Sequence, residues 1–229
     1  MKNTIKFLMI SALAGIILVS CKKNDYIIGG KLESTTTTLS TYDYLKSNRY
    51  NLFDTLLMVV DKAGLKDVIN QKGITFYAPT DFAINNYLQA KTLQAQKKDP
   101  FARYSIDTLI KYDLHVFKDS LNTYIIPKTV TYESLTENGV VFNTSKTGSQ
   151  AVISFEKTFD PNLGYTSATS TAPSLEYYTF IKGKLPNVVV APDIPDTVGV
   201  RVRCQTTGLT TSTGQLNVLS NSHVLFFKQ

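Results

Sequence analysis

The spacing of apolar residues changes part-way along this chain, and this change constrains the fold more than any other feature of the sequence. Between residues 44 and 114, apolar side chains recur at the helical period. After His115 they gather into short runs that are separated by turn residues, as β-strands are. Helices first and strands later predict an α+β domain with a largely antiparallel sheet.

The first part of the chain carries clear signals for helix ends. Ser40 followed by Asp43 resembles a capping box and begins the first helical segment. After the β-rich run 74–78, Pro79 ends the strand, and Thr80 or Asp81 can cap the next helix. Residues 89–104 are polar and predict an exposed helical extension or loop. Helical segments are expected near 44–60, 65–69, 82–88 and 106–114.

The second part predicts eight short strands. Its last two runs are joined by a turn at residues 220–222, and the stretches 160–173 and 186–195 predict loops. The expected strands are 129–135, 140–142, 151–155, 177–181, 188–191, 198–204, 215–219 and 224–227.

The N-terminus carries a lipoprotein signal. Lys2 and Lys6 precede an apolar run over residues 7–19, and Leu-Val-Ser-Cys at 18–21 is the tetrapeptide that lipoprotein signal peptidase recognises. The run is too short to cross a hydrocarbon core of about 30 Å. We therefore expect a signal peptide over 1–20 and a lipidated Cys21. The alternative is an ordinary secretory signal with Cys21 near the cleavage site by chance.

The segment after Cys21 predicts how the domain is attached. Residues 21–38 contain Gly and Thr tracts with little periodicity, which indicates a flexible tether between the lipid and the folded domain. Lys22 and Lys23 follow the cysteine where an aspartate would favour the inner membrane. We expect an outer-membrane lipoprotein in the cell envelope, facing either the periplasm or the cell surface.

Charge and cysteine content exclude several classes of protein. The 24 basic and 18 acidic residues are spread along the chain without an Arg-rich helix, so a nucleic-acid partner is not supported. Cys204 is the only cysteine besides Cys21, which rules out a disulfide framework. Cys204 shares one strand face with Val198, Val200 and Val202, so we expect a buried, inert thiol.

Motifs in the first part resemble the fasciclin family. Residues 75–84, Thr-Phe-Tyr-Ala-Pro-Thr-Asp-Phe-Ala-Ile, are similar to its first signature, and 51–56 and 63–65 resemble its opening helix and Ala-Gly-Leu turn. His115 matches the central Tyr-His signature, with leucine in place of tyrosine. The closing signature best matches residues 213–220, with Asn217 where histidine is usual; a rival match that places His223 there loses the glycine of the signature. The resemblance implies a single domain over 39–229, with helices packed on a β-sheet wedge and insertions near 89–104 and 157–195.

The resemblance also implies roles for individual residues. In the family's geometry the central histidine lies beside the first signature, so His115 is expected to hydrogen-bond Thr80 or Asp81 and to join helix and sheet. Asn217 completes this candidate structural motif. Fasciclin-like domains are mainly adhesion or extracellular binding modules without a common catalytic site.

Residue patterns give no support for catalysis. The chain has two histidines and lacks the motifs of metalloproteases, thiol redox proteins and serine hydrolases. Asp193 and Asp196 are the only carboxylate cluster that a hydrolase function could use, and a role in forming turns explains both residues better. We expect no enzyme activity, no catalytic residue, no cofactor and no metal.

Tyrosines are the best candidates for partner contact, because the chain has 13 of them and no tryptophan. Tyr165 lies in a long loop, and of the adjacent pair Tyr177 and Tyr178 one must face outward. Packing of the 157–195 insertion onto the domain is the alternative use of these rings. The expected partners are the membrane, through the lipid, and an envelope or extracellular protein or glycan. The alternative function is that of an accessory glycan-binding lipoprotein in a polysaccharide capture system.

Overall fold

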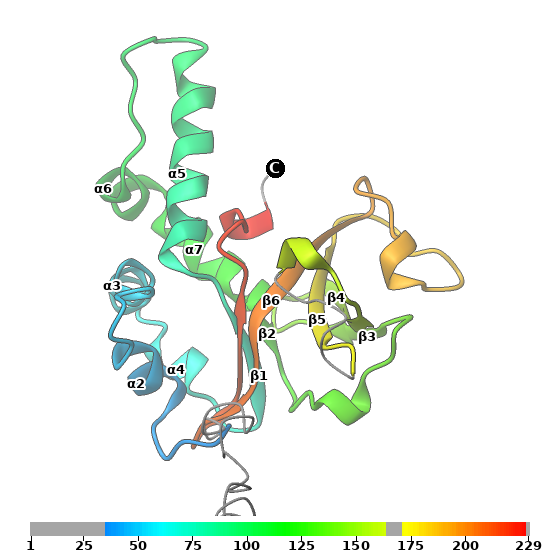
Figure 1. Ribbon diagram of the computed structural model, residues 1–229. Helices are drawn as coiled ribbons and strands as arrows, with labels where there is room; N and C mark the ends of the chain where they lie inside the picture. The colour runs from blue at the N-terminus through cyan, green and yellow to red at the C-terminus, as the bar shows by residue number, and fades with distance from the viewer. Residues whose placement is uncertain (1–34, 164–170, 228–229) are drawn as a thin grey trace, which may run out of the picture. The chain divides into compact units, whose positions relative to one another are not determined.

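A seven-stranded sheet in the order β2-β1-β7-β6-β5-β4-β3 organises the protein (Figure 1). We analysed a computed structural model that describes residues 35–163 and 171–227. β1 and β7 run parallel, and all other neighbouring strands are antiparallel, which confirms the expected α+β class. The strands are β1 Ile74–Ala78, β2 Ile125–Ile126, β3 Val140–Asn143, β4 Gln150–Lys157, β5 Ser174–Ile181, β6 Gly199–Thr210 and β7 Gly214–Leu219.

Strand β6 is the longest and joins the two halves of the sheet. Its first half pairs with β5 from Gly199 to Arg203, and its second half pairs with β7 from Cys204 onward. Two register shifts interrupt the second pairing, and such bulges bend a strand and increase its twist. In Figure 1, β6 runs from the β1–β7 half of the sheet across to β5.

Helices cover the half of the sheet that contains β1 and β7. α3 packs against α5 and α7, and α2 contacts β7. The helices are α2 Thr41–Lys46, α3 Asp54–Ala63, α4 Lys66–Ile69, α5 Asp81–Gln96, α6 Ile106–Thr108 and α7 Leu114–Leu121, with a π-helical segment, η2 Leu109–Asp113, between the last two. The polar helical extension expected after residue 88 is confirmed as far as Gln96.

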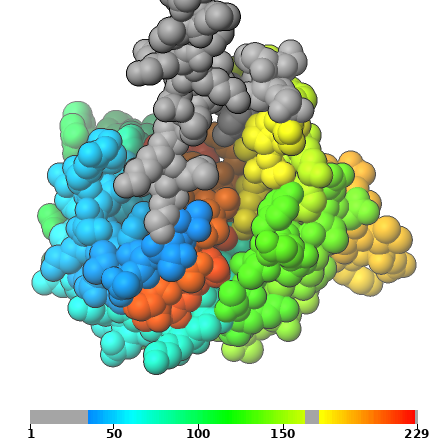
Figure 2. Space-filling model, turned by 60° about the horizontal axis from the view of Figure 1, so that its bottom comes forward, coloured from blue at the N-terminus to red at the C-terminus, as the bar shows by residue number. Residues whose placement is uncertain are grey.

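The helical segment expected over 44–60 is interrupted. Asn51 has a φ of 54°, a left-handed conformation that no helix contains, so α2 and α3 are separate. The α2 N-terminus is capped as expected, because the Ser40 side chain accepts a hydrogen bond from the Asp43 N–H. Thr41 Oγ1 then lies 2.9 Å from the hydroxyls of Thr211 and Thr213, which places α2 beside the β6–β7 hairpin (Figure 2).

Three expected strands are instead short 3₁₀ turns. η4 Tyr132–Ser134 replaces the strand at 129–135, where the Val130 N–H is satisfied by the Thr75 hydroxyl at 2.8 Å rather than by a strand. η6 Ala191–Asp193 replaces the strand at 188–191 and has a proline at its start. η7 Leu225–Phe227 replaces the terminal strand, because Phe226 and Phe227 have φ values of 62° and 55°.

The segment 157–195 is not an insertion throughout. Within it, β5 Ser174–Ile181 pairs with β4 on one side and β6 on the other, so this stretch is an integral strand of the sheet. The strand expected at 177–181 is confirmed and begins three residues earlier, at Ser174.

Candidate functional site

An open strand edge is the most distinctive surface feature of the sheet. The pairing of β6 with β7 ends at Cys204 and Leu219, whereas its pairing with β5 continues to Gly199. Residues 199–203 of β6 therefore have a strand neighbour on one side only. Ser220 still lies opposite Arg203, and the chain then turns away at residues 221–222.

Backbone hydrogen bonds show which groups this edge presents. Ser220 N–H donates to the Arg203 carbonyl at 2.8 Å, so the peptide groups of Arg203 point to the β7 side of the strand. Because strand groups alternate, those of Arg201 point the same way, and those of Val200 and Val202 point to β5. Among residues 35–163 and 171–227, the N–H groups of Arg201 and Arg203 have no backbone partner on the open side.

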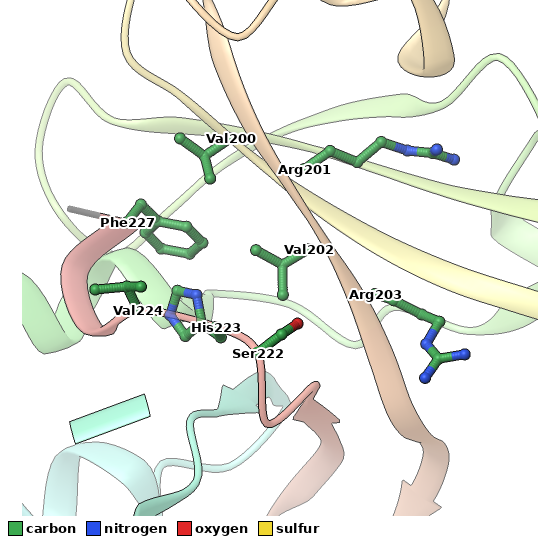
Figure 3. A pocket seen from close by; sticks show the side chains of 8 residues that line it. All are labelled: Val200, Arg201, Val202, Arg203, Ser222, His223, Val224 and Phe227. Carbon is green, nitrogen blue, oxygen red and sulfur yellow. The ribbon is translucent and has the colours of Figure 1, made fainter. Parts of the chain in front are cut away.

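A groove of about 230 Å³ follows this open edge (Figure 3). Its floor is β6 from Val200 to Arg203, and its opposite wall is the chain after β7. In Figure 3, Val200 and Val202 point toward Phe227 and His223, and the two arginines point to the other face of the sheet. The groove therefore offers free peptide groups between an apolar side and a cationic side. The wall residues are Ser222, His223, Val224 and Phe227.

The cationic side has one engaged and one available arginine. Arg201 lies with its guanidinium carbon 3.6 Å from the centre of the Tyr177 ring, and its Nη2 is 3.3 Å from Glu156 Oε2. Arg203, also half-buried, takes part in neither of the ion pairs found in the described part of the chain. Arg203 is thus free to attract an external anionic group.

One residue of the groove wall is a buried histidine, whose hydrogen bond attaches the wall to the core. His223 is 3% exposed, and its Nε2 lies 2.8 Å from the Tyr124 hydroxyl. That hydroxyl accepts the Phe226 N–H at 2.6 Å, so its own proton is available to donate to His223. Burial lowers the pKa of His223 to about 3, which keeps the ring neutral at physiological pH.

A buried carboxyl lies on the core face of β5. Glu176 Oε1 accepts hydrogen bonds from the Tyr77 hydroxyl and from Asn217 Nδ2, both at 2.9 Å. Burial raises the pKa of Glu176 to about 7, although the Tyr77 hydrogen bond acts in the opposite direction. Burial and the proximity of Glu176 also raise the pKa of the Cys204 thiol, whose expected burial is confirmed at 5% exposure.

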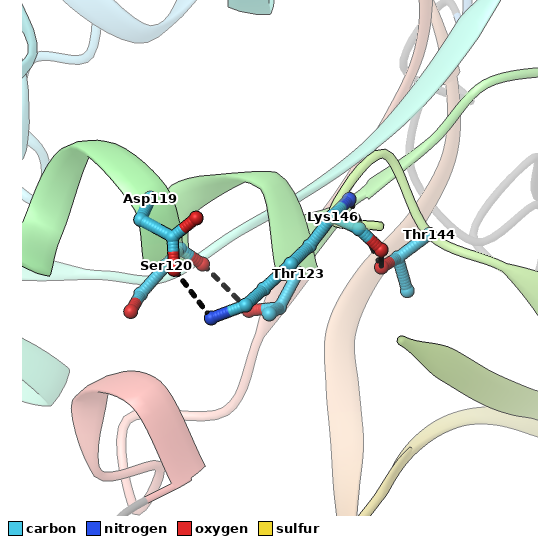
Figure 4. A network of polar contacts seen from close by, with 5 residues as sticks. All are labelled: Asp119, Ser120, Thr123, Thr144 and Lys146. Carbon is cyan, nitrogen blue, oxygen red and sulfur yellow. Dashed lines mark hydrogen bonds and ion pairs between the residues drawn. The ribbon is translucent and has the colours of Figure 1, made fainter. Parts of the chain in front are cut away.

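A second polar network is structural. Lys146 Nζ lies 2.6 Å from Asp119 Oδ2, and Lys146 N–H donates to the Asn122 carbonyl, which attaches the β3–β4 turn to the end of α7 (Figure 4). Asp119 is two-thirds exposed, and a pair of this kind contributes well below ~1 kcal/mol. In the described residues, no group of three or more His, Cys, Asp or Glu could hold a metal ion.

Comparison with known proteins identifies the family. A model of the fasciclin domain matches residues 51–200, which is more than half of the chain. The chain belongs to the fasciclin family. Fasciclin domains are non-catalytic binding modules, typically extracellular and involved in adhesion. A search of curated proteins found no match.

Among solved structures, this fasciclin chain is similar to a domain pair of the insect cell adhesion molecule fasciclin I. The two share 12% sequence identity with a TM-score of 0.46, over 79% of this chain. The chain spans 47% of the length of that domain pair. Within the described ranges, no helix combines the length and the apolar composition needed to cross a bilayer.

The structure does not form the hydrogen bond that the family resemblance implied for His115. His115 lies exposed on α7, and the Thr80 hydroxyl donates instead to Asn221 Oδ1 at 3.0 Å. The Asp81 carboxylate accepts the N–H groups of Thr55 and Leu56, at 2.8 and 2.9 Å, and so caps α3 rather than its own helix. The prediction for His115 was wrong because α7 turns that side chain toward solvent.

Asn217, which the resemblance assigned to a closing signature, lies in the buried cluster of Glu176. Besides donating to that carboxyl, its Oδ1 accepts the Gly208 N–H at 2.7 Å, which pins a bulged part of β6. Asn217 is therefore structural in this fold, but it has no contact with Thr80 or Asp81 in the hydrogen bonds found.

The tyrosine candidates separate into three cases. Tyr178 is fully buried, its ring stacks on Phe227, and its hydroxyl donates to the Thr123 carbonyl, so the prediction of a partner contact was wrong for this residue. Tyr177 faces the other side of β5 and is only half-buried under Arg201. Tyr165 and Cys21 lie outside the described residues.

Sequence reasoning missed Glu176, Arg203 and the wall residue His223. For Glu176 a signal existed, because strand alternation places this charged residue on the same face as Tyr178 in an otherwise apolar run. For the open edge, the predicted turn at residues 220–222 was a signal, but the register that leaves Arg201 without a second strand neighbour is set by the pairing of β6 with β5 and β7.

Proposed function

We propose that this protein is a bacterial envelope lipoprotein, anchored through Cys21, whose fasciclin domain binds an envelope or extracellular protein. The observation that carries the binding function is the match of the fasciclin model to residues 51–200. Fasciclin domains bind extracellular proteins and other ligands, and this property is the basis for proposing a protein partner here.

The sequence of the first 38 residues supports the anchor. A short apolar run that ends in Leu-Val-Ser-Cys is typical of a chain that is cleaved before the cysteine and acylated there. Several acyl chains hold such a protein stably, because each buried methylene contributes about 0.8 kcal/mol. A binding module fixed at a membrane gains from multivalent contact, since each further binding event takes place at a high effective concentration.

Surface features favour a protein partner over a glycan. Sugar binding by aromatic stacking needs an open ring face, and Arg201 covers one face of Tyr177. Tyr178 is buried and contributes no surface. The unpaired backbone N–H and C=O groups of an open strand edge, by contrast, can form hydrogen bonds with the backbone of a partner protein.

Metabolic labelling with an alkyne-bearing palmitate, followed by fractionation, tests the anchor. The full chain should incorporate label and enter the outer-membrane fraction, and Cys21→Ala should do neither. Label in Cys21→Ala, or an unlabelled wild type, would remove the lipoprotein assignment.

Proximity labelling on intact cells tests the binding function, with the Cys21→Ala form as the localisation control. Enrichment of one specific protein by the wild type supports the proposal. Co-enrichment of glycan-transport components, together with saturable oligosaccharide binding that Tyr177→Ala abolishes, would replace it with the glycan-capture function.

A further inference from the structure

The second half of α5 and the segment that returns from it to α6, residues 89–104, form an extension that we call the α5 arm; residues 97–103 are its tip. We infer that the tip binds an anionic membrane surface, with the Phe101 ring in the bilayer interface and the neighbouring cations on lipid phosphates. This inference goes beyond the proposed binding function and does not depend on the lipid at Cys21.

Hydrogen bonds fix the two sides of the α5 arm to each other. Thr92 Oγ1 accepts the Tyr104 N–H at 3.0 Å, and Gln96 Nε2 donates to the Ala102 carbonyl at 3.2 Å. Residues 97–101 are all exposed, so this order buries little apolar surface to offset the conformational entropy that it costs. A contact outside the domain would account for a tip that is held in this way.

The position of the tip suits contact with a separate surface. In Figure 1 the α5 arm extends beyond the other elements, and the start of the described chain, beside the β6–β7 hairpin, lies at the opposite end of the domain. The tip contact is therefore distinct from attachment through the N-terminus.

The tip presents a large apolar ring to solvent. Phe101 is 90% exposed, more than any other large apolar side chain in residues 35–163 and 171–227. Its N–H donates to Asp99 Oδ1 at 3.0 Å, which fixes the backbone that carries the ring. Phenylalanine is one of the residues that enter the boundary between lipid headgroups and acyl chains.

Cations surround this ring. Lys97, Lys98 and Arg103 are exposed, and none of them takes part in either ion pair found in the described ranges. Asp99 is the only acidic residue between them, and it already accepts the Phe101 N–H. Near an anionic bilayer each lysine or arginine strengthens binding about fivefold, within a Debye length of the surface. The tip thus combines an interfacial anchor with charge that is complementary to lipid phosphate.

Other occupants fit the tip less well. A second copy of the chain would bring the same cations together, which is unfavourable. The groove of about 480 Å³ that follows α5 is lined by residues 85–93 and Tyr104, so the tip lies outside it and Phe101 stands on a projection. A flat bilayer accepts a projecting ring directly, whereas a partner protein accepts it only through a matching pocket.

A single tryptophan reports on insertion, because the chain contains none. The full chain carrying Phe101→Trp is incorporated into vesicles of equal parts phosphatidylglycerol and phosphatidylcholine, and into vesicles of phosphatidylcholine alone. In the anionic vesicles we expect tryptophan emission at shorter wavelength and quenching by lipids with brominated acyl chains. In the neutral vesicles we expect neither.

Phe82→Trp is the matched control for insertion. Phe82 is 49% exposed on the first turn of the same helix, and the 14 residues from there to Gln96 rise about 21 Å. Its tryptophan should stay in water in both kinds of vesicle. A chain held to the vesicle only by its N-terminus would leave both tryptophans in water, so the comparison separates insertion of the tip from attachment through the lipid.

Charge reversal tests the electrostatic part of the inference. Lys97→Glu/Lys98→Glu, made in the Phe101→Trp chain, should lower the equilibrium constant for insertion by more than about 25-fold, since two cations are lost. Lys182→Glu/Lys184→Glu is the control, because it makes the same charge change at exposed positions outside the α5 arm and should have no effect.

Three results would overturn the inference: tryptophan of Phe101→Trp that stays in water in anionic vesicles, equal insertion in neutral vesicles, or equal quenching of Phe82→Trp. Capture of a protein or a glycan by the tip without insertion would also overturn it. The proposed function is decided separately, by lipid labelling at Cys21 and by the partner found on cells. Tip insertion without lipid at Cys21 would keep the inference and remove the anchor.

Discussion

Replacing Glu176 with glutamine tests whether a buried carboxyl makes this domain less stable as pH rises. Glutamine has the shape of the neutral acid, and its Oε1 can still accept from the Tyr77 hydroxyl and from Asn217 Nδ2. The change removes the titration and keeps the two hydrogen bonds. Tyr77 and Cys204, the titratable groups that face Glu176, both have a raised pKa and stay neutral below pH 8.

The magnitude follows from the pKa of Glu176. The folded pKa of about 7 lies above the ordinary value of 4.5, so the folded state holds the proton more tightly than the unfolded chain. The stability of the wild type is therefore highest, relative to the variant, below pH 4.5 and decreases as pH rises to about 7. At 1.36 kcal/mol per pKa unit, the ionised form costs about 3 kcal/mol.

His223 makes the comparison with the variant necessary. Its pKa is lowered from 6.5 to about 3, so its contribution to stability increases with pH over much of the range where that of Glu176 decreases. The two trends oppose each other between pH 4.5 and 6.5, and the wild type alone shows little slope from these two groups. Subtracting wild type from Glu176→Gln cancels the His223 contribution.

Urea unfolding of the full chain, followed by tyrosine fluorescence at pH 4.5, 5.5, 6.5 and 7.5, measures the difference. We expect Glu176→Gln to match the wild type at pH 4.5 and to exceed it by about 3 kcal/mol at pH 7.5. Glu137→Gln, at an exposed position, controls for the loss of one charge. A difference between Glu176→Gln and wild type that does not change with pH would refute the reasoning.

Three further changes probe other parts of the fold. Asp81→Ala should destabilise the domain by about 1–2 kcal/mol, because two N–H groups at the start of α3 lose their cap. Urea unfolding measures this beside Asp196→Ala, which removes a carboxylate at an exposed position. When the pH falls from 6.5 to 4, the wild type should lose about 3 kcal/mol more stability than His223→Gln, because unfolding lets the buried ring of the wild type take up a proton. Thermal unfolding of both proteins at pH 6.5 and at pH 4 measures this difference. Gly214→Ala should lower the melting temperature, since its Cβ would lie 2.2 Å from the Ile74 carbonyl oxygen, and an unchanged melting temperature would contradict the tight β1–β7 pairing.

Sequence reasoning predicted the elements whose signals are local. β1 was recognised from a β-rich run ended by Pro79, and α4 from three apolar residues at helical spacing. The three expected strands that the structure replaces with 3₁₀ turns have local strand signals, but tertiary contacts override these signals. In the last of them, the Phe226 N–H finds the Tyr124 hydroxyl, and both phenylalanines adopt left-handed backbone conformations that no strand contains.

The candidate site was predictable only in part. Alternation along β5 separated Tyr177 from Tyr178 correctly, but it could not say which ring was buried, because that depends on what packs on each face of the sheet. The role expected for His115 was transferred from a family pattern, and here α7 exposes that residue. The buried histidine that hydrogen-bonds to a tyrosine is His223, whose partner is Tyr124.

The sequence alone determined the fold class, the identity of the family signatures, the absence of a disulfide framework and the signals for a lipid anchor, because each depends on residues that lie close together in the chain. Tertiary structure decided which strands stop pairing and which side chains lose water. The open edge of β6 and the raised pKa of Glu176 arise from residues brought together across the sheet, and hydrogen bonding and burial at such contacts depend on distance in space rather than on distance in sequence.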